Sequence, residues 1–375
     1  PKGEGRKAIV TLSDDERDLL ALHLVTGVGP RLTSALLEHF GSASAVLGAS
    51  ISELTEVPFL GAKVAEALTR ALANPDVTRE SEAIAQHGVH LRVMGRPEYP
   101  ANLATIDDAP HLLFVRGAIE TRDEKAIAIV GSRACTSYGK RLAERIAQDL
   151  ARAGWTIVSG LARGIDGSAH RGALQANGRT LAVLAGGLSK IYPPEHKDLA
   201  AEVAAAGALI TESCMRMEPM ATLFPARNRI ISGLSRAVVI IEAAEKSGAL
   251  ITARLAAEQG REVFVVPGPV DSPASAGALQ LLRKGAKLVR HADDILEDMQ
   301  ELPSLVEDKP AQVALAPVEL DDLQRKIWDA LAERRNVEEL MEQLAMPVSE
   351  LGRQLMTLEL KKVVRRLPGN CYERF

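Results

Sequence analysis

Nine short apolar runs punctuate the middle of the chain, between residue 80 and about residue 300, and helical segments separate them. The runs are HLRVM (90–94), HLLFVRG (111–117), AIAIVGS (126–132), TIVSG (156–160), TLAVLAGG (180–187), ALIT (208–211), AVVIIEA (237–243), EVFVVPG (262–268) and KLVR (287–290). Most are apolar at consecutive positions, which is typical of strands that helices cover on both faces. This alternation predicts an α/β fold with a doubly wound, mostly parallel sheet.

The segment before these runs, residues 11 to about 75, reads as short helices. Two glycine-containing turns, TGVGP at 26–30 and VPFLGAK at 57–63, each precede a helical pattern of apolar residues. The arrangement resembles tandem helix-hairpin-helix units, in which glycine lets the backbone turn tightly and a helix N-terminus offers amides to phosphate. The turns carry few basic residues, so contact with a DNA backbone and a plain helical bundle are both open interpretations.

A third segment follows the Pro-rich, aperiodic stretch 301–317, which we interpret as a linker. Within 318–375 the pattern predicts helices at 319–334, 336–344 and 348–360, then a hairpin around a Pro-Gly-Asn turn. Three helices and a hairpin resemble a winged helix, a module that binds duplex DNA through its third helix or serves in protein docking. The end of this segment is basic, with Lys361, Lys362, Arg365 and Arg366.

The composition of this 375-residue chain limits the kinds of ligand and the cellular location that we expect. The net charge of −4 gives no reason to expect nucleic acid, so any such site must come from local basic clusters. The three cysteines are far apart and form no CxxC pair, which disfavours a metal cluster or a disulfide framework and suits a reducing cytosol. No apolar run reaches the roughly 18 residues of a membrane span. We therefore expect a cytoplasmic protein without membrane contact.

The first loop with chemical information, GSRACTSYG at 131–139, connects an apolar strand to a helix. Gly131 and Ser132 form a turn typical of phosphate binding, in which the helix N-terminus supplies amides. Arg133 adds a permanent cation where a phosphate would lie, although it could instead pair with a neighbouring carboxylate. The loop lacks GxGxxG, and the next strand does not end in the acidic residue that holds a ribose. A dinucleotide cofactor is therefore disfavoured, and we expect no cofactor.

In the second loop, SGLARGIDGSAHRGAL at 159–174, Gly160, Gly164 and Gly167 would allow close approach of a ligand backbone. Arg163 adds a positive charge to it. Asp166 and His170 lie one helical turn apart, but no third metal ligand has suitable spacing. We interpret this pair as a brace for the start of the helix.

The third loop, LAGGLSKIYPPEH at 184–196, brings a cation and an aromatic side chain to the end of the next strand. Lys190 and Tyr192 are these two residues. A ligand contact and a packed Tyr-Pro corner are equally good interpretations.

The fourth stretch, LFPARNRIISGLSRAVVIIEA from Leu223 to Ala243, combines an aromatic, two arginines and an asparagine in one loop. Phe224 suits stacking, and Arg227 and Arg229 suit phosphates. Asn228 suits an orienting contact or a cap. The set predicts single-stranded nucleic acid, because bases offer π-faces to aromatics while cations follow the backbone. Core packing of the phenylalanine and a structural role for one arginine are the alternatives.

Six motifs in this order resemble the DNA-processing protein A family, also called DprA or Smf. They are GSR…SYG, SGLARGID…AH, GGL…IYPPEH, FPARNRIISGLS, EA…SGALITAR and VFVVPG, within about residues 80–295. The resemblance implies a Rossmann-like domain at 80–300, flanked by the helical segment 11–75 and the winged-helix-like segment 318–375. It also implies a homodimeric protein that protects incoming single-stranded DNA and loads the RecA recombinase during natural transformation, without catalysis.

Carried over by motif, the resemblance places the GSR residues on one wall of a DNA pocket and the FPxRNR residues on the other. The expected DNA-binding set is Gly131, Ser132, Arg133, Arg163, Lys190, Phe224, Arg227, Asn228 and Arg229. The chain departs from the family after the VPG strand. Ala278 and Leu279 replace a usual Thr-Asn pair, so this chain does without that asparagine at the rim.

Other classes of function are weighed against this one. Glu242, at a strand end, is a candidate general base, yet no nucleophile or metal set accompanies it. A phosphoribohydrolase-like enzyme would carry PGGxGTxxE, which is absent. A nucleotide sensor with a small phosphate ligand and a pure protein adaptor are the remaining alternatives.

Overall fold

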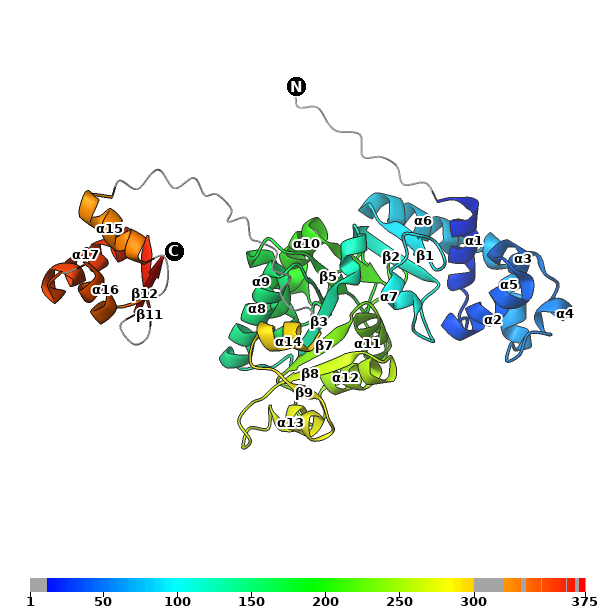
Figure 1. The fold of residues 1–375 in the computed structure, drawn as a ribbon. Helices are drawn as coiled ribbons and strands as arrows, with labels where there is room; N and C mark the ends of the chain where they lie inside the picture. Colours follow the sequence, from blue (N-terminus) through cyan, green and yellow to red (C-terminus); the bar gives the residue numbers. More distant parts are fainter. Residues whose placement is uncertain are drawn as a thin grey trace, which may run out of the picture. The chain divides into compact units, whose positions relative to one another are not determined.

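The structure is a computed structural model that describes residues 12–299, 320–331, 335–344, 346–361, 363–367 and 371–374. The chain divides into two compact units, Pro1–Leu302 and Pro303–Phe375, and each is described on its own (Figure 1). The predicted linker 301–317 and the basic residue Lys362 lie outside the described residues.

The first unit is built on a nine-stranded sheet of order β1-β2-β6-β5-β4-β3-β7-β8-β9. The strands are β1 (His90–Val93), β2 (Leu112–Gly117), β3 (Ala126–Gly131), β4 (Thr156–Ser159), β5 (Thr180–Val183), β6 (Ala208–Thr211), β7 (Ala237–Ile241), β8 (Glu262–Val266) and β9 (Lys287–Leu288). Strand β2 pairs antiparallel with β1 and β6, and the other neighbours pair in parallel. Each strand lies within one of the nine apolar runs, so the predicted mostly parallel sheet is confirmed.

Alternate side chains of each central strand enter two different cores. In β3, Ile127 and Ile129 face one core, whereas Ala128 and Val130 face the other. The first face is covered by α8 (Ser137–Arg152), α9 (Ile165–Gln175), α10 (Lys197–Ala206) and α14 (Ala292–Asp298), and the second by α7 (Ala101–Ala104), α11 (Leu223–Gly233), α12 (Gly248–Glu258) and α13 (Ala276–Arg283) (Figure 1). Burial on both faces explains why these runs show no polar alternation.

Six helices precede the sheet and share a hydrophobic core with its β1–β2 edge. They are α1 (Asp14–His23), α2 (Pro30–Phe40), α3 (Ala43–Gly48), α4 (Ile51–Leu54), α5 (Ala62–Thr69) and α6 (Pro75–His87). Helices α2 and α5 begin directly after Gly29 and Gly61, so both glycine turns lead into helices. The first turn lies against the sheet, because Gly29 lines a small cavity together with His111 and Glu212.

The second unit is a winged helix. It contains α15 (Asp322–Ala330), α16 (Val337–Leu344), α17 (Val348–Leu360), β10 (Arg335–Asn336), β11 (Val364–Leu367) and β12 (Cys371–Arg374). The strands form an antiparallel sheet of order β10-β12-β11 around a core that includes Leu351 and Leu355. The sequence did not predict β10, since two residues are too short to show a strand pattern.

Candidate nucleic-acid interface

The candidate site lies where the direction of the chain through the sheet reverses. From β3 the chain runs outward through β4, β5 and β6, returns to β7 beside β3, and then runs the other way through β8 and β9. The crevice beyond the carboxyl ends of β3 and β7 is thus the topological switch point, where ligands bind in open α/β sheets. A groove of about 790 Å³ occupies it, lined by the loop after β3, the start of α11 and the start of α12.

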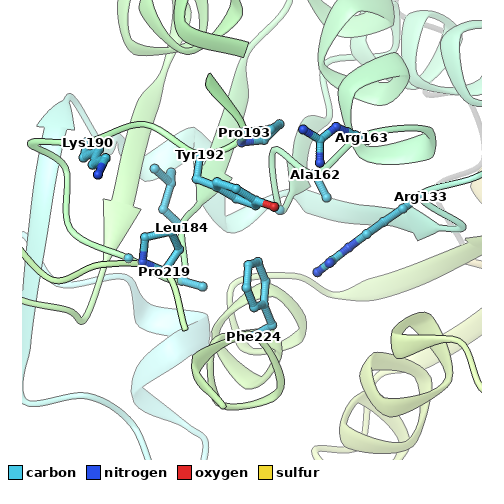
Figure 2. Close-up of a pocket in the computed structure, with 12 residues that line it drawn as sticks. Arg133, Ala162, Arg163, Leu184, Lys190, Tyr192, Pro193, Pro219 and Phe224 are labelled. Carbon is cyan, nitrogen blue, oxygen red and sulfur yellow. The ribbon is translucent and has the colours of Figure 1, made fainter. Parts of the chain in front are cut away.

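Two adjacent aromatic rings lie between two guanidinium groups where this groove meets a smaller pocket that adjoins it. The guanidinium carbon of Arg133 lies 4.5 Å from the ring centre of Phe224, and that ring meets Tyr192 edge-on at 6.1 Å. The Arg163 guanidinium lies 5.8 Å from the Tyr192 ring. Figure 2 shows these four side chains converging from four separate segments of the chain. Such a cluster offers faces for stacking bases and cations for phosphates.

The FPARNR motif is helical, and the prediction of a loop there is wrong. The whole motif lies within α11, whose helical period separates its side chains onto different faces. Phe224, Arg227 and Asn228 face the groove, and Asn228 donates a hydrogen bond of 3.4 Å to the carbonyl of Gly248. Arg229 lies on another side of the helix.

Arg227 forms part of the groove floor and is buried, which corrects the expectation that it faces phosphates at the surface. Its guanidinium donates to the carbonyl oxygen of Val183 and lies against Gly160, where an added Cβ would stand 1.9 Å from Nη1. Burial lowers the pKa of Arg227 to about 10, so it is still charged at neutral pH. Burial also raises the pKa of Asp166, whose carboxylate accepts the amide of Gly160 at 3.1 Å. Arg227 therefore contributes positive potential from below the groove.

Arg229 is buried away from the groove, which corrects the second arginine assignment. Its guanidinium pairs with Glu212 at 2.8 Å and with Asp108 at 3.1 Å. Neither the groove nor the adjoining pocket includes Arg229 in its lining. This side chain ties α11 to the segments around it.

The carboxylate of Glu242 binds at the start of α8. The Glu242 carboxylate accepts the backbone amide of Thr136 at 2.7 Å and a short hydrogen bond from the Thr136 hydroxyl, and it lies so close to Gly139 that a Cβ there would stand 2.6 Å from Cδ. The amides of Thr136 and Gly139 thus have partners within the protein, and phosphate binding at this helix start stays a prediction. Because both oxygens of Glu242 make these contacts, the candidate general base is already hydrogen-bonded within the protein.

Gly131 and Ser132 line the groove at the end of β3. A Cβ on Gly131 would stand 1.9 Å from the carbonyl oxygen of Ile241, so glycine lets β3 end against β7. The Ser132 amide donates to the Glu242 carbonyl at 2.7 Å. These contacts set the direction in which the next residue, Arg133, leaves the sheet.

Arg163 and Lys190 line the smaller pocket and are exposed, as expected of ligand contacts. Each is paired with a carboxylate of the protein. Arg163 binds Glu195 through two hydrogen bonds, and Lys190 binds Glu218 at 2.8 Å.

His170 is buried beneath the groove, where its Nδ1 lies 2.6 Å from the Thr180 hydroxyl. Burial lowers the pKa of His170 to about 3. The unfolded chain therefore binds this proton more readily than the fold, and stability falls as the pH drops below about 6.5. Between pH 7 and pH 5.5 we expect a loss of about 1 kcal/mol from this residue.

Urea unfolding at both pH values checks this expectation. A His170→Gln variant should lose less stability over the same interval. An equal loss in both proteins would assign the pH dependence to other groups.

Among the residues that the structure describes, no group of three or more His, Cys, Asp or Glu side chains is arranged to hold a metal ion. Within the same ranges, no helix has the length and apolar character needed to cross a membrane.

Comparison with known families gives a direct match across this site. The family described as DNA recombination-mediator protein A matches residues 90–300. The chain belongs to this family. The DprA winged helix domain matches residues 310–370, and the SAM-like helix-hairpin-helix tandem matches residues 17–74.

Two relatives and two solved structures illustrate the similarity to DprA proteins. Protein Smf of Escherichia coli strain K12 is 41% identical over 80% of this chain and 82% of its own length. DNA processing protein DprA of Bacillus subtilis strain 168 is 42% identical over 60% of this chain and 77% of its own. The X-ray structure of DprA from Streptococcus pneumoniae has a TM-score of 0.67 and 32% identity, covering 77% of this chain and 99% of that one. A structure of DprA from Helicobacter pylori, which concerns its single-stranded DNA binding mode, has a TM-score of 0.51 and 30% identity, covering 56% and 96%.

The departure from the usual DprA sequence after β8 lies away from the groove lining. Ala278 is buried in α13, and its amide donates to the carbonyl of Ala243 at 3.1 Å. Leu279 is half-buried, and neither residue lines the groove or the adjoining pocket.

The lining of this DprA groove adds one aromatic side chain and one cation to the expected binding set. Tyr192 lies between the groove and the adjoining pocket, and its presence in a chain with only 3% aromatics was the available signal. Lys246, in the loop before α12, adds an exposed cation to the groove. Lys246 follows the end of a strand, as the other loop cations do, and this position in the sequence could have predicted its place in the groove.

Proposed function

We propose that this protein binds single-stranded DNA in the groove at the β3–β7 switch point and loads a RecA recombinase onto it, without catalysis. The observation that carries the proposal is the cluster in which the adjacent rings of Phe224 and Tyr192 lie between the guanidinium groups of Arg133 and Arg163. Ring faces that stack on bases need bases that are not already stacked in a duplex. The cluster therefore favours a single strand.

A strand also fits the groove better than a mononucleotide. The exposed cations come from several loops, and Lys190 and Lys246 extend the set beyond the aromatic cluster. A mononucleotide does not need cations from so many loops, whereas a strand presents a phosphate at each nucleotide. The amide of Thr136 at the start of α8, a donor that a nucleotide phosphate could use, already donates to Glu242.

Two features support the RecA part of the proposal. The family that matches residues 90–300 is described as a DNA recombination mediator. The related structure from Helicobacter pylori concerns binding of single-stranded DNA, the substrate on which RecA filaments form. Measuring RecA filament assembly on a strand with and without the protein would test loading.

We also propose that the protein acts as a homodimer. Analytical ultracentrifugation would test this proposal.

The primary experiment is fluorescence anisotropy of a labelled oligo-dT and of its duplex over a salt series. A strong preference for the single strand, with log K falling by about 0.7 per phosphate contact against log salt, supports the proposal. Equal or absent binding contradicts it. Mononucleotides that compete as well as oligo-dT would point to a small phosphate ligand instead.

Replacing Phe224 by leucine should lower the affinity for oligo-dT about fivefold, since stacking on an aromatic ring is worth about 1 kcal/mol or more per base. Leucine retains an apolar side chain at this half-buried position, so the fold should persist. Phe40→Leu, at a half-buried phenylalanine in α2, is the matched control and should leave affinity unchanged. Unchanged affinity in Phe224→Leu would exclude stacking on this ring.

A further inference from the structure

Two of the exposed cations that line the smaller pocket are neutralised by the protein itself. Arg163 donates from Nε and Nη2 to the two carboxylate oxygens of Glu195, with Nη2 at 3.1 Å from Oε2. Lys190 Nζ lies 2.8 Å and 3.1 Å from the oxygens of Glu218. The side chains are half exposed, at 50% each in the first pair and 67% and 62% in the second, so solvent and ligands can reach both pairs.

These carboxylates have the chemistry of the ligand that the cations would otherwise bind. A carboxylate and a phosphate both offer two oxygens to an arginine fork, so one competes directly with the other. The hydrogen bonds from Arg163 lower the pKa of Glu195, which keeps that competitor ionised at neutral pH. The aromatic rings also have partners within the protein, because the Arg133 guanidinium lies over Phe224 and the Arg163 guanidinium lies near Tyr192.

We propose that Glu195 and Glu218 are specificity-determining residues, which compete with phosphate for the cations of the smaller pocket and so select ligands that carry several phosphates. This inference rests on the proposed function. A surface ion pair is weak, worth about 1 kcal/mol or less, so a strand that makes several contacts displaces it readily. A single phosphate gains one contact, must displace a carboxylate for it, and is then repelled by the displaced charge.

The test measures oligo-dT affinity, and competition by thymidine monophosphate, for Glu195→Gln, Glu218→Gln and the double variant. Each single substitution should raise oligo-dT affinity about threefold at low salt, and the double variant about tenfold, since the two pairs are separate. The salt dependence should steepen as each cation becomes free to bind a phosphate. Thymidine monophosphate should compete better against the double variant than against the unaltered protein.

Glu258→Gln is the matched control, because Glu258 forms an exposed pair with Arg254 on α12 and lines neither pocket. It should leave all affinities unchanged. The gain from Glu195→Gln should also vanish when Arg163 is replaced by alanine, which shows that the carboxylate acts through that cation.

Failure of the inference and failure of the proposed function give different results. If the unaltered protein binds oligo-dT but both glutamine variants bind it equally or more weakly, the inference is overturned and the proposed function stands. An equal gain in Glu258→Gln would also overturn it, since the effect would then be one of net charge. If the unaltered protein does not bind oligo-dT at any salt concentration, the proposed function itself fails.

Discussion

Replacing Arg133 by alanine is expected to lower the affinity for oligo-dT about thirtyfold. Arg133 is exposed at the junction of the groove and the smaller pocket, and its guanidinium covers the ring of Phe224. A hydrogen bond to a charged group contributes about 2 kcal/mol when its partner is available, which corresponds to this loss. The slope of log K against log salt should also decrease by about 0.7, because one phosphate contact disappears.

Arg79→Ala is the control for this experiment. Arg79 is an exposed arginine in α6 that pairs with Asp76, and it lines neither pocket. Its replacement should change neither affinity nor slope. A titration of Arg133→Ala that overlays the unaltered protein, in affinity and in salt dependence, would remove this residue from the DNA site.

The sheet could be predicted from sequence because its signal is local and repeated. Each strand is a short apolar run between turn residues. In β3 and β7, neighbouring side chains point to opposite faces of the sheet and are buried in two different cores, so that every position is apolar. The carboxyl ends of parallel strands gather at one edge of a sheet, where ligands bind in such folds. The loops that carry Arg133, Arg163 and Lys190 could therefore be placed at that edge from sequence alone.

The state of each charged side chain could not be predicted in the same way. Arg227 and Arg229 are two residues apart, but the helical period of α11 sends one to the groove floor and the other to Glu212 and Asp108. The partners lie far away in sequence, so spacing gives no sign of them. Glu242 illustrates the same limit, because only the fold reveals that its carboxylate lies at the start of α8.

The burial of Arg229 leads to the largest expected effect on stability. Arg229→Met should lower the free energy of unfolding by about 3 kcal/mol, because Glu212 and Asp108 lose the cation that compensates them while methionine retains most of the packing volume. Affinity of the folded protein for oligo-dT should stay within about twofold, since the side chain does not line the groove.

Arg133→Met provides the reciprocal control for Arg229→Met and separates folding from binding. It replaces an exposed arginine, so it should change the free energy of unfolding by less than about 0.5 kcal/mol while weakening oligo-dT binding. Urea unfolding and anisotropy on the same two preparations measure both quantities.

If Arg229→Met instead kept its stability and lost affinity, Arg229 would have to leave its carboxylates to reach the strand, and the FPARNR helix would open when DNA binds. The predicted pattern assigns the two arginines of one motif to different tasks, with Arg229 holding α11 in place and Arg227 supplying charge beneath the groove that Arg133 borders.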